Sequence, residues 1–233
     1  MLSRTRLLLG DATVNALQQK TVTVVGLGGV GGYAAEALAR SGIGKLHLVD
    51  ADTVQTSNLN RQIFATKETI GWNKTEAAKK RIEAVSDCIV TTSDVFVTAE
   101  TAEEALVPCD YLVDAIDSLS GKLALLAWAT ERGIPLLVCM GAGNRIGTEF
   151  FVTDLSKTEG CPLARRYRQA ARKMGILHVP CVVSREQAKK VAQTEIGSLA
   201  PTVGAAGLTA AAYVIRNWTE QEKEQKHGRK ETV

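Results

Sequence analysis

The feature that most constrains the fold is a glycine-rich segment directly after a run of β-branched residues. Thr21–Val25 reads Thr-Val-Thr-Val-Val, which is typical of a buried parallel strand. It runs into Gly-Leu-Gly-Gly-Val-Gly, and a helical pattern follows over 34–40. In such a turn Gly26 makes the tight bend, Gly28 lets the backbone approach a phosphate, and Gly31 allows close helix–strand packing. The segment predicts a nucleotide-binding strand–loop–helix unit.

The rest of the chain alternates strand-like and helical patterns, which predicts a doubly wound, mostly parallel α/β sheet of Rossmann-like type. We expect one domain over residues 1–233, with a core over about 10–153 and a small C-terminal extension over about 154–233. A strand over 148–153 is expected to be antiparallel, and the charged stretch 220–233 is expected to be frayed. The other expected strands are 45–49, 89–92, 111–116, 135–140 and 179–184, and the other expected helices are 1–20, 76–84, 102–106, 122–132, 163–173 and 202–218.

Composition excludes several classes of protein. A hydrophobic fraction of 45% with 20 Gly and only 5 Pro is incompatible with a disordered or collagen-like chain. Five widely spaced Cys without a C-x-x-C pair argue against a disulfide scaffold and a four-cysteine zinc site. The apolar run Leu7–Leu9 is too short for a signal peptide, and the Gly- and Ala-rich stretch 199–215 is too short for a membrane span. We therefore expect a cytoplasmic protein without stable membrane insertion.

The residues after the glycine loop indicate which nucleotide is bound. Asp50 ends the second expected strand, where a carboxylate suits the hydroxyls of a ribose. A nicotinamide dehydrogenase needs little beyond this acid, whereas this chain continues with Arg61 and Lys74. Two cations suit a triphosphate, because adenylation requires neutralisation of the charge on departing pyrophosphate. The combination predicts ATP rather than NAD, although each cation alone is also typical of a solvated surface.

A pair of carboxylates follows the strand expected over 111–116. Ligands of open α/β sheets bind at the carboxyl ends of the strands, which is where Asp114 and Asp117 fall. Asp114 can pair with a backbone amide or cap a helix. Asp117 lies one step further into the loop and is the better candidate for Mg²⁺, which a lone carboxylate commonly holds together with phosphates. Helix capping remains the alternative for both.

Taken together, these motifs resemble the E1-like superfamily of ThiF, MoeB and HesA proteins, which activate a carboxylate by transferring AMP to it from ATP. The resemblance implies ATP and Mg²⁺ as ligands, with Asp117 on the metal and Arg61, Lys74 and Asp117 in catalysis. It also implies a homodimer in which an N-terminal arginine reaches the partner's ATP site; Arg4 matches that position best, and Arg6 is its competitor. The implied nucleotide contacts are Gly26, Gly28, Gly29, Gly31, Asp50, Asp52, Ser57, Asn58, Asn60, Arg61, Lys74, Asp117 and Ser118.

Within that superfamily the chain is similar to the tRNA threonylcarbamoyladenosine dehydratase branch. The similarity implies ATP-dependent cyclisation of N6-threonylcarbamoyladenosine at position 37 of tRNA, through adenylation of the threonyl carboxylate. The alternative is adenylation of the C-terminal carboxylate of a small sulfur-carrier protein, and a third hypothesis is a non-catalytic scaffold for cysteine desulfurase or sulfur-acceptor partners. The segments that carry the similarity include Asn60–Ile63, Asp114–Ser118, Gly141–Gly143, Val152–Thr158, Pro162–Ala164 and Ala206–Leu208.

One cysteine departs from the branch, which commonly has Asp at the position of Cys161. A Cys in a basic loop can have a lowered pKa and act as a nucleophile, so Cys161 is a candidate, with Cys181 behind it. The dehydration can also proceed within the substrate, without a covalent enzyme intermediate. Cys88, Cys109 and Cys139 fall in or beside expected strands and are interpreted as small core residues.

A basic segment suggests the surface that meets the substrate. The net charge is only +3, yet residues 157–190 carry nine Lys and Arg against two acids. Helical spacing places Arg165, Arg168 and Arg172 on one face, where they can follow a phosphate backbone, and Tyr167 is expected to stack on a base. A merely solvated basic surface is the alternative. The cations assigned to tRNA are Arg165, Arg166, Arg168, Arg172 and Lys173.

Overall fold

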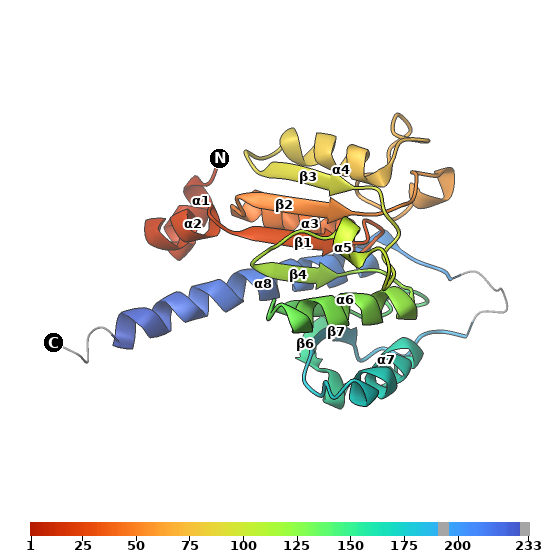
Figure 1. The fold of residues 1–233 in the computed structure, drawn as a ribbon. Helices are drawn as coiled ribbons and strands as arrows, with labels where there is room; N and C mark the ends of the chain where they lie inside the picture. The colour runs from red at the N-terminus through yellow and green to blue at the C-terminus, as the bar shows by residue number, and fades with distance from the viewer. Residues whose placement is uncertain (191–195, 229–233) are drawn as a thin grey trace.

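A computed structural model describes residues 1–190 and 196–228, and in them seven strands form one sheet (Figure 1). The order is β3-β2-β1-β4-β5-β7-β6, and every neighbouring pair is parallel except β6 and β7. This confirms the predicted doubly wound α/β fold, including the antiparallel strand. The strands are β1 Thr21–Val25, β2 Lys45–Val49, β3 Ile89–Ser93, β4 Tyr111–Asp114, β5 Leu136–Cys139, β6 Phe150–Asp154 and β7 Pro180–Ser184.

Helices cover both faces of the sheet and bury two apolar cores (Figure 1). On one face lie α3 Gly31–Ser41, α4 Lys74–Glu83 and α8 Ala200–Gly228, and on the other lie α5 Ala102–Ala105, α6 Leu119–Glu131 and α7 Pro162–Lys173. The central strands are apolar on both sides because both of their faces are covered. The remaining helices are α1 Ser3–Leu9, α2 Asp11–Leu17, η1 Thr56–Asn58 and η2 Leu155–Lys157.

The C-terminal part of the chain is integral to this architecture. β7 pairs with β5 inside the sheet, and α8 packs along α3. The two helices approach closely through small residues: a Cβ on Gly207 would lie 2.3 Å from the carbonyl oxygen of Val30. Strand β7 and helices α7 and α8 therefore complete the same sheet and the same cores.

The helices differ most from the prediction at the two ends of the chain. The N-terminal segment is two helices rather than one, because Gly10 adopts a positive φ of 83° between them. The last helix continues to Gly228, so the expectation of a frayed end is wrong for 220–228, and residues 229–233 lie outside the described part. None of the described helices is long and apolar enough to cross a membrane.

Candidate nucleotide-binding site

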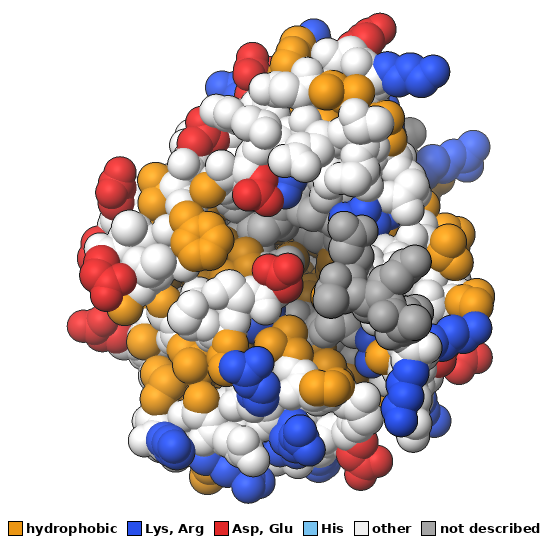
Figure 2. Space-filling view, turned by 90° about the vertical axis from the view of Figure 1, so that its right-hand side faces the viewer, with side chains coloured by type: hydrophobic (Ala, Val, Ile, Leu, Met, Phe, Trp, Pro, Cys, Tyr) orange, Lys and Arg blue, Asp and Glu red, His pale blue; other side chains and the backbone are white. Residues whose placement is uncertain are grey.

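A cavity of about 420 Å³ opens at the carboxyl ends of β1 and β4. The chain leaves these neighbouring strands in opposite directions, toward β2 and toward β5, and a crevice forms where the sheet order reverses. Figure 2 shows this face hollowed at its centre. Of the residues predicted to contact the nucleotide, those that line the cavity are Gly26, Gly28, Gly29, Asp50, Asp52, Asn58, Arg61, Lys74, Asp117 and Ser118.

Gly26 and Gly31 of the glycine loop are packed too tightly to carry a side chain. Gly26 has a φ of 89°, and a Cβ there would lie 2.9 Å from the carbonyl group of Ala115. A Cβ on Gly31 would lie 1.8 Å from the carbonyl oxygen of Gly26, so Gly31 serves packing rather than the cavity wall. Helix α3 begins here, and the free N–H groups of a helix N-terminus favour a phosphate.

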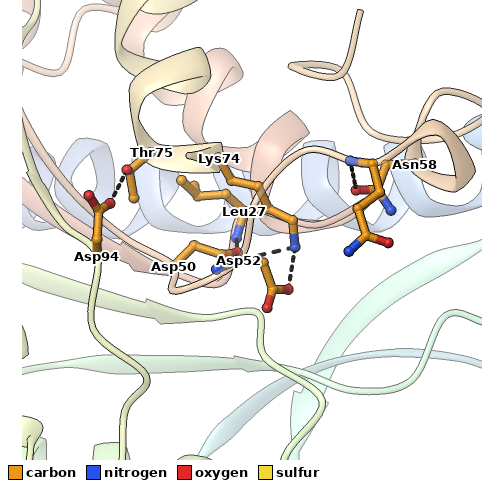
Figure 3. A network of polar contacts seen from close by, with 8 residues as sticks. Leu27, Asp50, Asp52, Asn58, Lys74, Thr75 and Asp94 are labelled. Carbon is orange, nitrogen blue, oxygen red and sulfur yellow. Dashed lines mark hydrogen bonds and ion pairs between the residues drawn. The ribbon is translucent and has the colours of Figure 1, made fainter. Parts of the chain in front are cut away.

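Asp50 and Lys74 meet at the end of β2 (Figure 3). The Asp50 carboxylate accepts hydrogen bonds from the backbone N–H of Leu27 (2.6 Å) and of Asp52 (2.9 Å). The Nζ atom of Lys74 lies 3.6 Å from Asp50 and donates to the Asp52 carboxylate at 2.6 Å. Lys74 is only 7% exposed, and the carboxylates of Asp50 and Asp52 balance the charge of this buried ammonium group. An anion that approaches Lys74 competes with Asp52, whose side chain is 69% exposed.

The residues on either side of Lys74 are also held in place. Lys74 is the first residue of α4, and Asp94 accepts hydrogen bonds from the Asn73 amide (2.8 Å) and from the Thr75 hydroxyl. Asp94 follows β3, so the carboxyl end of that strand anchors the N-terminus of α4. The position of Lys74 thus depends on two strand ends.

Arg61 is oriented by its neighbours in the turn after η1. Its guanidinium donates to the Ser57 carbonyl oxygen at 2.7 Å and to the Asn60 side chain at 3.0 Å. Asn60 in turn donates to the carbonyl oxygen of Ser198 at 3.0 Å. Ser57 and Asn60 therefore hold Arg61 at the cavity, which they do not themselves line.

Asp114 and Asp117 have different environments although only two residues lie between them. Asp114 is fully buried, and burial raises the pKa of its carboxyl group while the nearby Lys122 ammonium opposes that rise. Asp117 is exposed in the cavity, and no hydrogen bond or ion pair to its carboxylate occurs within residues 1–190 and 196–228. Helix α6 is capped by the Ser118 hydroxyl, which accepts from the N–H of Gly121. Of these two carboxylates, Asp117 lines the cavity and Asp114 does not.

Part of the cavity wall comes from residues that the motifs did not indicate. Val95, Phe96 and Val97 follow β3, and the Phe96 side chain is 60% exposed. Gly141–Gly143 follow β5. The rule that ligands bind at the carboxyl ends of strands points to both segments. Val203 reaches the cavity from α8, where no local sequence signal indicates it.

The two N-terminal arginines differ in their partners. Arg6 donates hydrogen bonds to Asp11 (3.0 Å), Asn15 (2.9 Å) and Gln18 (3.1 Å), which are all on α2 or directly after it. Arg4 is exposed on α1 and does not line the cavity of its own chain. Arg4 rather than Arg6 is therefore available to another molecule.

The cysteines divide by burial. Cys181, the second candidate nucleophile, is fully buried in β7, and burial raises the pKa of its thiol, so its environment does not suit a nucleophile. Cys88 and Cys139 are core residues as predicted, and burial raises the pKa of the Cys88 thiol to about 11. Cys109 and Cys161 are half-buried. Cys161 directly precedes α7 without a side-chain hydrogen bond to the helix, and its Sγ atom would lie 3.9 Å from a Cβ on Gly141, a residue of the cavity wall.

Helix α7 presents fewer cations to solvent than its sequence predicts. Tyr167 is fully buried, so the prediction that it stacks on a base is wrong. Arg168 is half-buried, and its guanidinium donates to the carbonyl oxygen and hydroxyl of Thr158, both at 2.6 Å. Figure 2 shows Lys and Arg side chains along the lower part of the hollowed face, where α7 lies. The exposed cations of α7 are Arg165, Arg166, Arg172 and Lys173.

The fold and the cavity define a ThiF-type domain: the ThiF family model matches residues 2–232, and the chain belongs to the ThiF family. It is 42% identical over 177 residues to the tRNA threonylcarbamoyladenosine dehydratase of Bacillus subtilis, covering 75% of this chain and 70% of that protein. The protein of that name from Escherichia coli is 40% identical over 190 residues, with 77% and 71% covered. The crystal structure of the Escherichia coli enzyme in complex with ATP has a TM-score of 0.89 at 35% identity over 96% of each chain. The resemblance seen in the motifs is confirmed.

Proposed function

We propose that the protein is an ATP-dependent dehydratase that cyclises N6-threonylcarbamoyladenosine at position 37 of tRNA. The observation that carries the proposal is that one cavity is lined by the glycine loop, Asp50, Lys74, Arg61 and Asp117. The chain is also 42% identical to a tRNA threonylcarbamoyladenosine dehydratase. The ligand in the similar crystal structure is ATP. The runner-up remains adenylation of a sulfur-carrier protein.

The chemistry requires activation, because a carboxylate is a poor electrophile. An oxygen of the threonyl carboxylate attacks the α-phosphorus of ATP and pyrophosphate leaves. A nitrogen of the same substrate then attacks the acyl carbon, the ring closes, and AMP departs. Both steps build negative charge on phosphate oxygens, which Arg61 and Lys74 are placed to stabilise. Asp50 binds the ribose hydroxyls.

Asp117 is proposed to hold Mg²⁺. Its carboxylate faces the cavity and is a hard oxygen ligand of the kind that Mg²⁺ takes together with phosphates. Mg²⁺ held there would neutralise part of the negative charge of the phosphates. Lys74 and Arg61 then act on the charge that remains.

A second copy of the chain is the proposed partner at the N-terminus. Leu7 and Leu8 on α1 are 78% and 83% exposed, which is costly for large apolar side chains unless another surface covers them. Arg4 lies on the same short helix. In a homodimer with exchanged arms, burial of the leucines would carry Arg4 to the partner's cavity.

The proposed surface for tRNA is the exposed cationic side of α7, since this helix starts beside the cavity at Cys161 and Gly141. Cations within reach of the reaction site let the phosphate backbone position the modified base. Cysteine desulfurase or sulfur-acceptor proteins are further proposed partners.

The test is mass spectrometry of nucleosides after incubation of the protein with ATP, Mg²⁺ and tRNA that carries the threonylcarbamoyl group. We expect loss of 18 mass units from the modified nucleoside and one AMP per product, with none in Asp50→Ala. Unchanged tRNA, together with ATP–pyrophosphate exchange that depends on a carrier protein ending in Gly-Gly, would replace this function by the runner-up.

A further inference from the structure

A lysine is completely buried beneath the cavity and takes no part in the chemistry described above. Lys122 on α6 and Asp114 at the end of β4 are both 0% exposed, and their Nζ and Oδ1 atoms are 2.9 Å apart. Removal of two charges from water is expensive, and apolar replacements of buried ion pairs are often equally stable or more stable. Stability is therefore a weak reason for the pair, and its position suggests another.

The pair closes a ring around the turn that bears Asp117. Oδ1 of Asp114 also accepts a hydrogen bond from the N–H of Ile116 at 3.2 Å, and its Oδ2 has no partner among the described residues. The N–H of Lys122 donates to the carbonyl oxygen of Ser118 at 3.0 Å as α6 begins. From Asp114 the chain thus runs through the turn into the first turn of α6, and the Lys122 side chain returns to Asp114.

The same ammonium group holds a second strand end. Nζ of Lys122 donates to the carbonyl oxygen of Cys139 at 2.8 Å. Cys139 ends β5, and Gly141–Gly143 of the cavity wall follow it. One buried cation therefore ties together the two strand ends from which the 115–118 and 141–143 segments start.

The turn has little freedom on its opposite side. The backbone of Ala115 would be 2.9 Å from a Cβ on Gly26, and its side chain would be 3.0 Å from a Cβ on Gly31. The glycine loop and the Asp117 turn are thus in direct contact above the ion pair. A shift of the turn would move Asp117 relative to the loop that receives the phosphates.

We propose that Lys122 and Asp114 are positioning residues that set the place of Asp117 and of the 141–143 wall relative to the glycine loop. This inference rests on the proposed function for the identity of the reaction. Neither side chain lines the cavity, so neither is proposed to contact the substrates. The pair acts through the turn above it.

The test uses the full chain with Lys122→Met, Asp114→Asn and the double variant, which removes both charges. Displacement of a reacting group by about 1 Å can cost roughly 100-fold in rate, so we expect kcat to fall by roughly 10- to 100-fold. KM for ATP should stay within a few-fold of wild type, and half-maximal activity should require more Mg²⁺. Hydrogen exchange measured by mass spectrometry should quicken in the peptide that covers residues 114–122.

Trp128→Phe is the matched control, because Trp128 is buried on the same helix outside the ring. It should leave kcat, the Mg²⁺ requirement and exchange at 114–122 close to wild type. If Lys122→Met does not fold, the double variant decides, since it leaves no unpaired buried charge. A folded double variant with wild-type kcat, Mg²⁺ requirement and exchange would overturn the positioning role.

Failure of the proposed function gives a different result. Asp117→Asn tests the metal role directly, and an unchanged Mg²⁺ requirement in that variant would remove the metal from Asp117. If Asp117→Asn strongly lowered kcat while the Lys122 and Asp114 variants kept wild-type kcat, the proposed function would stand. The positioning role of Lys122 and Asp114 would then be refuted.

Discussion

At the scale of single residues, the site separates cations that act alone from cations that are already paired. Arg61 bonds only neutral oxygen atoms in the described residues, whereas Lys74 lies between the Asp50 and Asp52 carboxylates. Loss of Lys74 leaves two carboxylates facing each other with no cation between them. Substitutions of Arg61 and of Lys74 should therefore differ in their effects on kcat and on ATP affinity.

We predict that Arg61→Ala lowers kcat by roughly 100-fold with little change in ATP affinity, because its charge acts on the transition state. Lys74→Ala should lower kcat similarly and also weaken ATP binding, since Asp50 loses its counter-charge. Steady-state kinetics and calorimetric titration with ATP measure the two effects. Lys79→Ala, a half-exposed lysine of the same helix, should resemble wild type. Near wild-type turnover in both site variants would contradict the assigned roles.

His47 on β2 predicts a pH dependence of stability. Its Nδ1 lies 2.9 Å from the Thr91 hydroxyl and its Nε2 lies 2.9 Å from the carbonyl oxygen of Ala105, which suits a neutral ring that donates from Nε2. Burial lowers the pKa of His47 below 6.5 in the folded state, so the unfolded chain takes up the proton first. The contribution of His47 is complete above pH 6.5 and is lost as the pH falls below it.

The measurement is thermal unfolding of wild type and His47→Gln between pH 7.5 and 5. We expect the wild-type Tm to fall more steeply than that of the variant across this range. Parallel curves would show that His47 does not couple to folding.

At the scale of elements, α7 shows how one helix divides its residues between core and solvent. Ala164, Tyr167 and Ala171 are spaced by three and four residues and are all buried. That spacing is the ordinary apolar stripe of an amphipathic helix. The prediction that Tyr167 stacks on a base relied on its charged neighbours and overlooked that Tyr167 belongs to the apolar face of the helix.

We predict that Arg165→Ala with Arg172→Ala flattens the salt dependence of tRNA binding by about one to two units of log K against log salt. Arg168 is a poor choice for this test, because its loss also breaks the contact with Thr158. Filter binding across a salt series provides the slopes. The double variant Lys45→Ala with Lys79→Ala removes the same charge elsewhere and should keep the wild-type slope. If both double variants gave that slope, α7 would be only a solvated surface.

At the scale of the whole molecule, local sequence patterns predicted the fold, but they predicted only part of the cavity lining. The β-branched run of β1, the glycine loop and Asp50 are contiguous signals, and the structure joins them as predicted. The turn that orients Arg61 was visible as a string of polar residues. Val203 meets the glycine loop from a distant segment, whereas Lys122 pairs with Asp114 across a single turn and with the carbonyl oxygen of Cys139 on the next strand. A single sequence carries no periodic or spacing signal for either contact.

The proposed homodimer predicts complementation between inactive variants. Arg4→Ala and Asp50→Ala should each be nearly inactive, because one lacks the donated arginine and the other lacks the ribose contact. In a mixed dimer, one site combines an intact Arg4 with an intact Asp50, so mixing should restore part of the activity. The assay is product formation after subunit exchange has been verified by mass spectrometry. Exchange without rescue would refute the shared site.

The contact between Val203 and the glycine loop also has a temporal consequence. A Cβ on Gly29 would lie 2.8 Å from Val203, and Ile196 and Ser198 line the same cavity. The phosphate loop is synthesised early, and residues that enclose it from 196 to 203 follow only much later in the chain. Nascent chains that stop before α8 should therefore expose an open loop and fail to retain ATP, whatever structure their first strands have reached. Acquisition of the ligand would thus wait until α8 has been synthesised.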